Sequence, residues 1–60
     1  MKQMLLFSAD WCVPCQTIKP QFLELPESYP DVEFTVLDVA IAKQAVRKYK
    51  IRGIPTVILL

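Results

Sequence analysis

Cys12 and Cys15 stand three positions apart and are the only cysteines in the chain of 60 residues. They follow a short apolar run and open a segment of helical periodicity, which places both thiols at the first turn of a helix. Unpaired N–H groups and the helix dipole stabilise a thiolate there. Motifs of this type lower a cysteine pKa from about 8.5 to roughly 3.5–7.5. Because a thiolate attacks disulfides and a second thiol can resolve the product, the spacing indicates thiol–disulfide exchange.

The two thiols are predicted to differ in accessibility. Cys12, at the helix start, is predicted to be the exposed attacking thiol. Cys15 shares an apolar stripe with Ile18, Phe22 and Leu25 and is predicted to be the buried resolving thiol.

Two other uses of the cysteine pair stay open from the residues alone. A Cys-x-x-Cys pair is half of a four-ligand zinc site. The chain has no histidine and no second cysteine pair, so a complete zinc site would need two chains. The other use is an inert structural disulfide, although so short a loop constrains the unfolded chain only slightly. Redox exchange is the favoured interpretation.

Five segments are predicted to position the cysteines, beginning with a strand and a helix. Residues 4–7 form a continuous apolar run, typical of a strand buried on both faces. The helix begins at Cys12 and accepts Pro14 in its first turn, where a missing N–H is harmless. Pro20 is expected to kink this helix, and Pro26 helps to end it.

The second half of the chain continues the alternation of strands and helices. Residues 32–39 predict a strand, residues 41–50 an amphipathic helix with its basic side chains outward, and residues 56–60 a third strand. The first two strands, joined by a helix, are expected to form a right-handed parallel unit.

Length and composition predict one small domain spanning residues 1–60. A hydrophobic fraction of 53% is too high for a disordered segment. At this length only about 60% of the unfolded surface becomes buried, so we expect marginal stability. The net charge of +1 gives no electrostatic footprint for nucleic acid.

The charges are unevenly distributed along the chain. Residues 1–42 hold two basic and six acidic side chains, whereas residues 43–52 hold five basic side chains and no acid. The basic members are Lys43, Arg47, Lys48, Lys50 and Arg52. We interpret this run as the solvated face of a helix, with a docking surface for an acidic partner as the sharper alternative.

No apolar stretch approaches the roughly 20 residues of a membrane span or the h-region of a signal peptide. Two closely spaced cysteines also differ from the disulfide framework of a secreted domain. The sequence therefore predicts a soluble, cytoplasmic protein without membrane or nucleic-acid partners.

Two segments resemble the signature motifs of the thioredoxin family. Residues 7–15, which read FSADWCVPC and are followed by Pro20, resemble the family's active-site segment. Residues 49–56, which read YKIRGIPT, resemble the loop that carries a cis-proline. Residues 32–39 match the strand between them, so the resemblance spans nearly the whole chain.

The resemblance implies a protein disulfide reductase with Cys12 as nucleophile and Cys15 as resolving thiol. Pro55 would be the cis-proline facing the sulfurs, and Ile54 would offer its backbone to an extended substrate. Trp11 would form the apolar rim of the substrate groove, with ordinary partial burial as its alternative. The predicted substrate-binding residues are Trp11, Val13, Pro14, Ile54 and Pro55.

The resemblance also implies the partners. No metal or organic cofactor is expected, since the dithiol is itself the redox group. Disulfide-containing proteins would be the substrates, and a thioredoxin reductase or small thiols would recycle the pair. This would place the protein in electron transport and cell redox homeostasis.

The fold implied is an α/β, thioredoxin-like β-α-β-α-β core. We expect a three-stranded mixed sheet in the order 2-1-3, with the third strand antiparallel and one helix on each face. The family's N-terminal strand and helix and its C-terminal strand and helix are lacking, which predicts a truncated or minimal form. The strand at residues 56–60 would then be an uncovered apolar edge, and such edges recruit other chains. The alternative function is therefore a catalytically incomplete fragment or assembly module that self-associates through this strand.

Three positions depart from the family pattern. Val13 replaces the usual glycine between the cysteines, so a reduction potential particular to this chain is expected. Leu6 stands where the family often carries a buried aspartate, and Val36 stands at its frequent lysine partner. An apolar environment raises the pKa of a thiol, so Cys15 is predicted to be harder to deprotonate.

Overall fold

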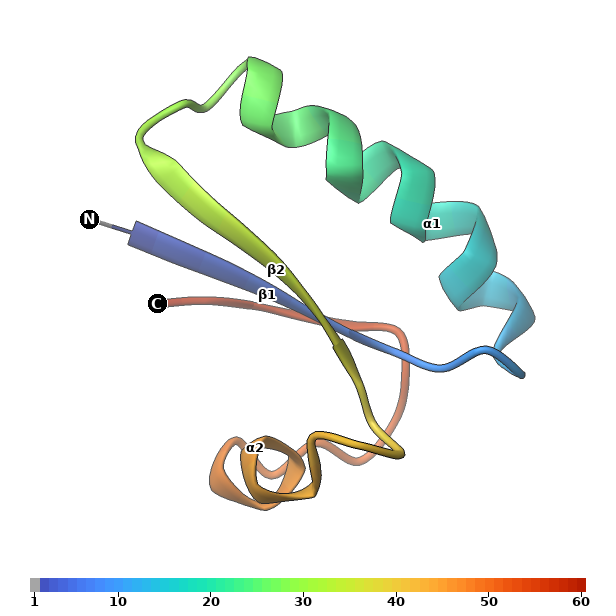
Figure 1. Ribbon diagram of the computed structural model, residues 1–60. Helices are drawn as coiled ribbons and strands as arrows, with labels where there is room; N and C mark the ends of the chain where they lie inside the picture. The colour runs from blue at the N-terminus through green and yellow to red at the C-terminus, as the bar shows by residue number, and fades with distance from the viewer. Residues whose placement is uncertain (1) are drawn as a thin grey trace.

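A computed structural model describes residues 2–60 and contains three strands and three helical segments. Figure 1 shows their course from the N-terminus to the C-terminus. In chain order they are β1 (Lys2–Ser8), α1 (Val13–Glu24), the 3-10 helix η1 (Leu25–Glu27), β2 (Val32–Asp38), α2 (Lys43–Lys48) and β3 (Thr56–Leu59). The predicted β-α-β-α-β order is confirmed.

The three strands form one mixed sheet in the order β2-β1-β3. β1 runs parallel to β2, with Lys2 opposite Val32, and antiparallel to β3, with Met4 opposite Leu59. The predicted order and directions are therefore confirmed. The continuous apolar run explains why β1 is the central strand, since Leu6 and Phe7 are both fully buried.

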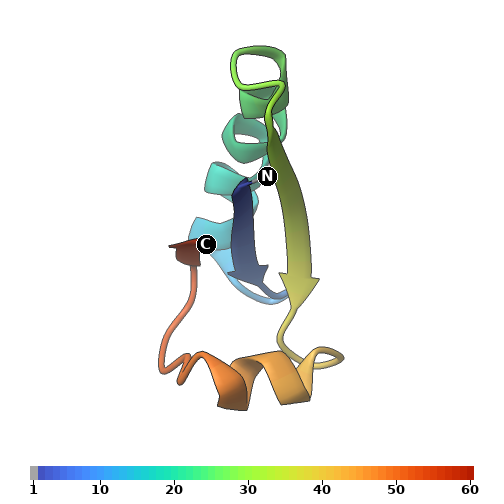
Figure 2. The same ribbon diagram turned by 90° about the vertical axis from the view of Figure 1, so that its left-hand side faces the viewer.

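The two helices lie on opposite faces of the sheet, as predicted. On one face Phe22 of α1 packs edge-to-face against Phe34 of β2, with ring centroids 5.5 Å apart. On the other face Tyr49, the C-cap residue of α2, packs edge-to-face against Phe7, with ring centroids 6.2 Å apart. Side chains alternate along a strand, and Phe7 therefore points away from the face that Phe34 and its neighbour Met4 share. Figure 2 shows α2 beyond the arrowheads of β1 and β2, so this helix covers only one end of its face.

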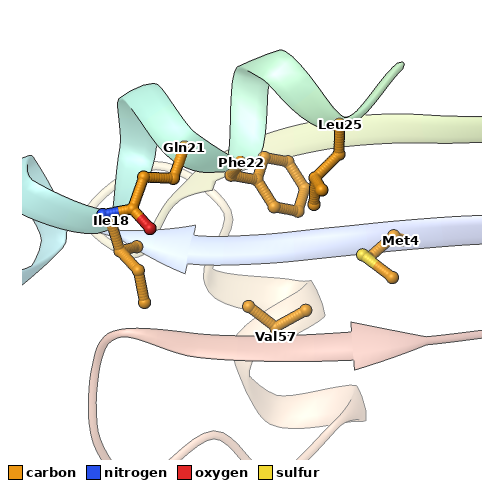
Figure 3. A pocket seen from close by; sticks show the side chains of 6 residues that line it. All are labelled: Met4, Ile18, Gln21, Phe22, Leu25 and Val57. Carbon is orange, nitrogen blue, oxygen red and sulfur yellow. The ribbon is translucent and has the colours of Figure 1, made fainter. Parts of the chain in front are cut away.

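The apolar stripe of α1 is only partly buried. Cys15 and Phe22 are buried and Leu25 is half-buried, but Ile18 is 37% exposed. Ile18 borders a groove of about 240 Å³ between α1, β1 and β3, which Val57 and Met4 also line (Figure 3). The helix continues through Pro20, and the kink there stays a prediction.

α2 is shorter than the predicted helix at residues 41–50, because its end is set by backbone conformation. Lys50 has a φ of 54°. Its N–H donates to the Arg47 carbonyl at 3.3 Å, and the Ile51 N–H donates to the Val46 carbonyl at 2.9 Å. These two bonds form a Schellman cap, which usually places glycine in the left-handed position. Because this position holds lysine and not glycine, the helix end could not be predicted from the sequence.

β3 is an outer strand with exposed apolar side chains, as expected for residues 56–60. Val57 is 47% exposed and Leu59 is 59% exposed. Beyond the strand, Leu60 and Gln3 exchange hydrogen bonds of 2.8 and 3.3 Å. Hydrogen-bonded and non-bonded pairs alternate in an antiparallel ladder, so Val57 and Leu59 direct their N–H and C=O groups away from β1. Those groups face the free edge of the sheet.

Candidate redox-active site

A tight turn links β1 to α1 and places Cys12 at the helix N-cap. The Ala9 carbonyl accepts hydrogen bonds from the Cys12 N–H at 3.1 Å and from Gln16 Nε2 at 2.9 Å. Ala9 is 2% exposed and Cys12 is also buried, so both ends of this turn are packed into the protein, while Asp10 and Trp11 between them are exposed. The buried end of β1 and the first turn of α1 therefore hold the cysteine motif from both sides.

Cys12 and Cys15 are joined by a disulfide, with their Cα atoms 5.2 Å apart. The Cys15 N–H donates to Cys12 Sγ at 3.3 Å, which satisfies one of the free donors at the start of α1. A donor aimed at this sulfur also favours negative charge on it after reduction. The site thus combines a closed dithiol with a backbone group that supports a thiolate at Cys12.

Cys12 is less accessible than the sequence predicted. It is only 6% exposed, while Cys15 is completely buried. The predicted order of exposure is correct, but the prediction of an exposed Cys12 is wrong. Val39 and Ile54 pack against the cluster of buried residues that contains both cysteines. These two side chains come from the end of β2 and the loop before β3, which sequence spacing alone does not place beside Cys12.

The structure brings the second motif against the first. The peptide bond between Ile54 and Pro55 is cis, as the resemblance implied. Ile54 contacts the cysteine cluster directly, and Thr56 Oγ1 donates to the Gly53 carbonyl to close the turn. The cis-proline loop therefore forms one wall of the candidate redox site.

A groove of about 440 Å³ opens beside the cysteine cluster. It is lined by Trp11, Val39, Val46, Ile51, Arg52, Gly53 and Ile54. Trp11 is 73% exposed and lies on the surface beside the groove. The alternative expectation for Trp11, ordinary partial burial, is therefore wrong. Of the predicted substrate-binding residues, only Trp11 and Ile54 line this groove; Val13, Pro14 and Pro55 are not among its lining residues.

Sequence reasoning missed five of the lining residues. Val39 was visible only as the end of a strand, and Val46 only as an apolar position of the second helix. The Schellman cap brings Val46 and Ile51 together through their hydrogen bond of 2.9 Å. A hydrophobic residue after a helix end was the signal available for this contact.

Gly53 has no structural requirement for glycine within the described chain. Its φ is not in the left-handed region, and a Cβ built on it would meet no atom within 4 Å. The open space above Gly53 belongs to the groove, which leaves room for another backbone to approach closely.

The surroundings of the site are apolar. Leu6, which stands where the resemblance implied a buried aspartate, is completely buried in β1. Over residues 2–60, no three His, Cys, Asp or Glu side chains converge in a way that could hold a metal ion. Neither of the helices within that range is long and apolar enough to cross a membrane.

Comparisons with known proteins agree with the geometry of the site. The family model described as Thioredoxin matches residues 1–60. Thioredoxin H5 of Oryza sativa subsp. japonica is 42% identical over 57 residues, which are 95% of this chain and 42% of the rice protein. A thioredoxin of Ophiophagus hannah is 44% identical over 50 residues, which are 83% of this chain and 48% of the snake protein.

Solved structures show the same fold. The Fasciola hepatica thioredoxin has a TM-score of 0.92 at 34% identity, over 98% of this chain and 57% of the other. Oxidised thioredoxin O2 from Arabidopsis thaliana has a TM-score of 0.91 at 32% identity, over 100% of this chain and 54% of the other. The chain therefore spans about half the length of the relatives that it matches. The family model, the relatives and the shared fold together show that the chain belongs to the thioredoxin family.

Proposed function

We propose that this protein is a thiol–disulfide oxidoreductase that reduces protein disulfides. The observation that carries the proposal is the disulfide of Cys12 and Cys15 at the start of α1, packed against Ile54 of the cis-proline loop. A redox-active pair needs two sulfurs within bonding reach and a surface where a second disulfide can approach. The groove beside the cluster supplies that surface.

The reaction begins with the reduced protein and ends with the disulfide that the structure contains. The Cys12 thiolate attacks one sulfur of the substrate disulfide, the substrate S–S bond breaks, and the departing sulfur takes up a proton. Cys15, after losing its proton, then attacks Cys12 Sγ and breaks the mixed disulfide. The second substrate sulfur leaves as a thiol. Two electrons have passed to the substrate, and Cys12 and Cys15 are oxidised to their disulfide.

Burial assigns the two cysteines to different steps. Cys12 is the one residue of the pair with any exposed surface, and we assign it the attack on substrate. Cys15 is completely buried and lies next to Cys12, so it is suited to the intramolecular step. We propose that Trp11 and Ile54, which line the groove, contact the substrate chain around its disulfide.

The partners that this function requires follow from its chemistry. An external thiol or dithiol reductant must return two electrons to the oxidised pair in each cycle. We propose a thioredoxin reductase or small thiols for this role, and no cofactor beyond the dithiol. We also propose a cytoplasmic setting in electron transport and redox homeostasis, supported by the pairing of both cysteines in one local motif.

The test is reduction of a disulfide-bonded peptide with excess dithiothreitol as the recycling reductant. We expect the protein to accelerate reduction well beyond dithiothreitol alone. Cys12→Ser should abolish the acceleration, because the attacking thiolate is lost. Cys15→Ser should accumulate a covalent adduct with the peptide, visible by mass spectrometry, because nothing resolves the mixed disulfide. Thr17→Ser, an exposed and conservative change in α1, serves as the control.

Two outcomes would contradict the proposal. Reduction no faster than with dithiothreitol alone would leave the motif without catalytic use. Binding of one zinc ion per two reduced chains, measured on the purified protein, would assign the thiols to an intermolecular metal site instead.

A second candidate function is supported by the exposed surface of β3. Val57 and Leu59 are exposed on an outer strand whose backbone groups face away from β1. We propose that this strand is the site of self-association if the protein acts as an assembly module.

A further inference from the structure

Five basic side chains gather in the segment of residues 43–52, which contains no acidic residue. All five are exposed. They are Lys43, Arg47, Lys48, Lys50 and Arg52. We call this set the basic segment. Only Lys2 and Lys19 carry basic side chains elsewhere in the chain, so the positive charge is concentrated in one place.

The basic segment borders the groove beside the cysteines. Arg52 itself lines the groove. Lys43 lies one helical turn before Val46, which also lines it, and residues three apart share a side of a helix. Lys50 directly precedes Ile51, another lining residue. Arg52 therefore lies in the wall that α2 and the following loop contribute, and Lys43 lies on the same side of α2 as this wall.

Two acidic side chains are next in sequence to residues of this groove but are not among its lining residues. Asp10 is exposed and directly precedes Trp11. Asp38 directly precedes Val39, and its carboxylate accepts a hydrogen bond from the Ala40 N–H at 2.8 Å. Among the lining residues Arg52 alone is charged, so a ligand in the groove meets apolar side chains and this cation.

We propose that the basic segment selects disulfide-bearing polypeptides that carry acidic residues beside the disulfide. This inference rests on the proposed function and adds the substrate class to it. The acidic residues of the substrate lie toward Arg52 and Lys43, and the open space above Gly53 admits the substrate backbone. A charge pattern of this kind acts mainly on the rate of encounter and on the choice of partner.

The charge pattern favours an acidic polypeptide over nucleic acid. The whole chain carries a net charge of only +1, and residues 1–42 hold six acidic side chains. A nucleic-acid surface requires many cations along an extended backbone track. A short acidic stretch needs only the local cations of the basic segment.

The experiment compares three peptides that share one intramolecular disulfide and differ only in three flanking residues. These are three glutamates, three serines or three lysines. We measure kcat/KM with excess dithiothreitol at low and at high salt. We expect the glutamate peptide to be reduced about tenfold faster than the serine peptide at low salt, and the lysine peptide more slowly. The difference should shrink at 0.5 M salt, because screening then acts within about 4–5 Å.

Two double variants locate the effect. Lys43→Glu with Arg52→Glu should remove the preference for the glutamate peptide and favour the lysine peptide. Lys2→Glu with Lys19→Glu changes the net charge by the same amount outside the basic segment, and should keep the preference. The salt dependence of the unmodified protein tests the proposal even if the first double variant does not fold.

Each outcome separates this inference from the proposed function. If none of the peptides is reduced, the proposed oxidoreductase function fails. If all three are reduced at equal rates, the function stands and the substrate class is wrong. If both double variants lose the preference equally, the preference depends on the net charge of the protein and not on the basic segment. A single-stranded oligonucleotide that binds and blocks reduction of the glutamate peptide would reassign the surface to nucleic acid.

Discussion

Phe22 connects α1 to the sheet through one aromatic contact. It is 4% exposed, and its ring lies edge-to-face on Phe34 at a centroid distance of 5.5 Å. Removing a buried phenylalanine ring costs about 3–5 kcal/mol. The whole stability expected for 60 residues is roughly 3–9 kcal/mol. We therefore expect Phe22→Ala to lose most or all cooperative unfolding in urea, followed by circular dichroism.

The adjacent residue provides the control for this prediction. Leu23 is 54% exposed in the same turn of α1, and Leu23→Ala should change the free energy of unfolding by less than about 0.5 kcal/mol. Equal destabilisation by both substitutions would mean that helix propensity, and not the contact with Phe34, accounts for the effect.

Where the sequence-based prediction and the structure differ at a single residue, the cause is a neighbouring side chain that comes from a distant segment of the chain. The identity of the redox pair and the burial of Cys15 followed from the motif and the helical stripe. The shielding of Cys12 did not, because Val39 and Ile54 arrive from other parts of the chain. Residue spacing predicts which side chains share a helix face, but it does not predict which loop covers them.

At the scale of the element, the end of α2 is under local strain. Lys50 adopts a φ of 54° to complete the Schellman cap, which costs roughly 1–2 kcal/mol for a residue with a Cβ. A glycine at this position would not have this conformational cost, although it loses more backbone entropy on folding than lysine does. We expect Lys50→Gly to raise the free energy of unfolding by about 0.5–1 kcal/mol, measured by urea titration.

A glycine inside α2 gives the matched comparison. Arg47→Gly removes the same charge but falls within helical backbone, where glycine is unfavourable by about 0.5–1 kcal/mol. The two substitutions should therefore shift the urea midpoint in opposite directions. A shift in the same direction would show that charge, and not the backbone conformation of Lys50, controls the stability of this cap.

Element types and sheet order were predictable because each segment has a clear pattern. The apolar run at residues 4–7 marks the central strand, and the structure extends it to Lys2–Ser8. The boundaries of α2 were not predictable in the same way. Its end depends on one left-handed lysine, and propensity treats lysine as an ordinary helix former. The groove beside the cysteines was missed for the same reason, since the cap builds one wall of it.

At the scale of the whole molecule, β3 is an outer strand of the sheet that residues 2–60 form. Val57 and Leu59 face solvent, and their backbone groups point away from β1. If this edge pairs with a second copy, the apparent mass in sedimentation should rise with protein concentration, and so should the unfolding midpoint. Leu59→Lys should return the protein to the monomer, because a charge on an edge strand opposes pairing.

The control for the edge is an equally exposed apolar residue away from the sheet. Ile41 is 82% exposed and lies just before α2, so Ile41→Lys should leave the mass distribution unchanged. A protein that stays monomeric at every concentration would remove self-association through β3 and leave the oxidoreductase proposal as the single candidate function.

The central position of β1 has a consequence for the order in which the sheet can form. β1 pairs with β2 on one side and with β3 on the other, and β3 follows α1, β2 and α2 in the chain. Until β3 pairs, one side of β1 has unpaired N–H and C=O groups beside the apolar side chains of Leu5, Leu6 and Phe7. An unpaired apolar strand of this kind is prone to aggregation during folding, and the hydrogen bonds of β3 close that side of β1.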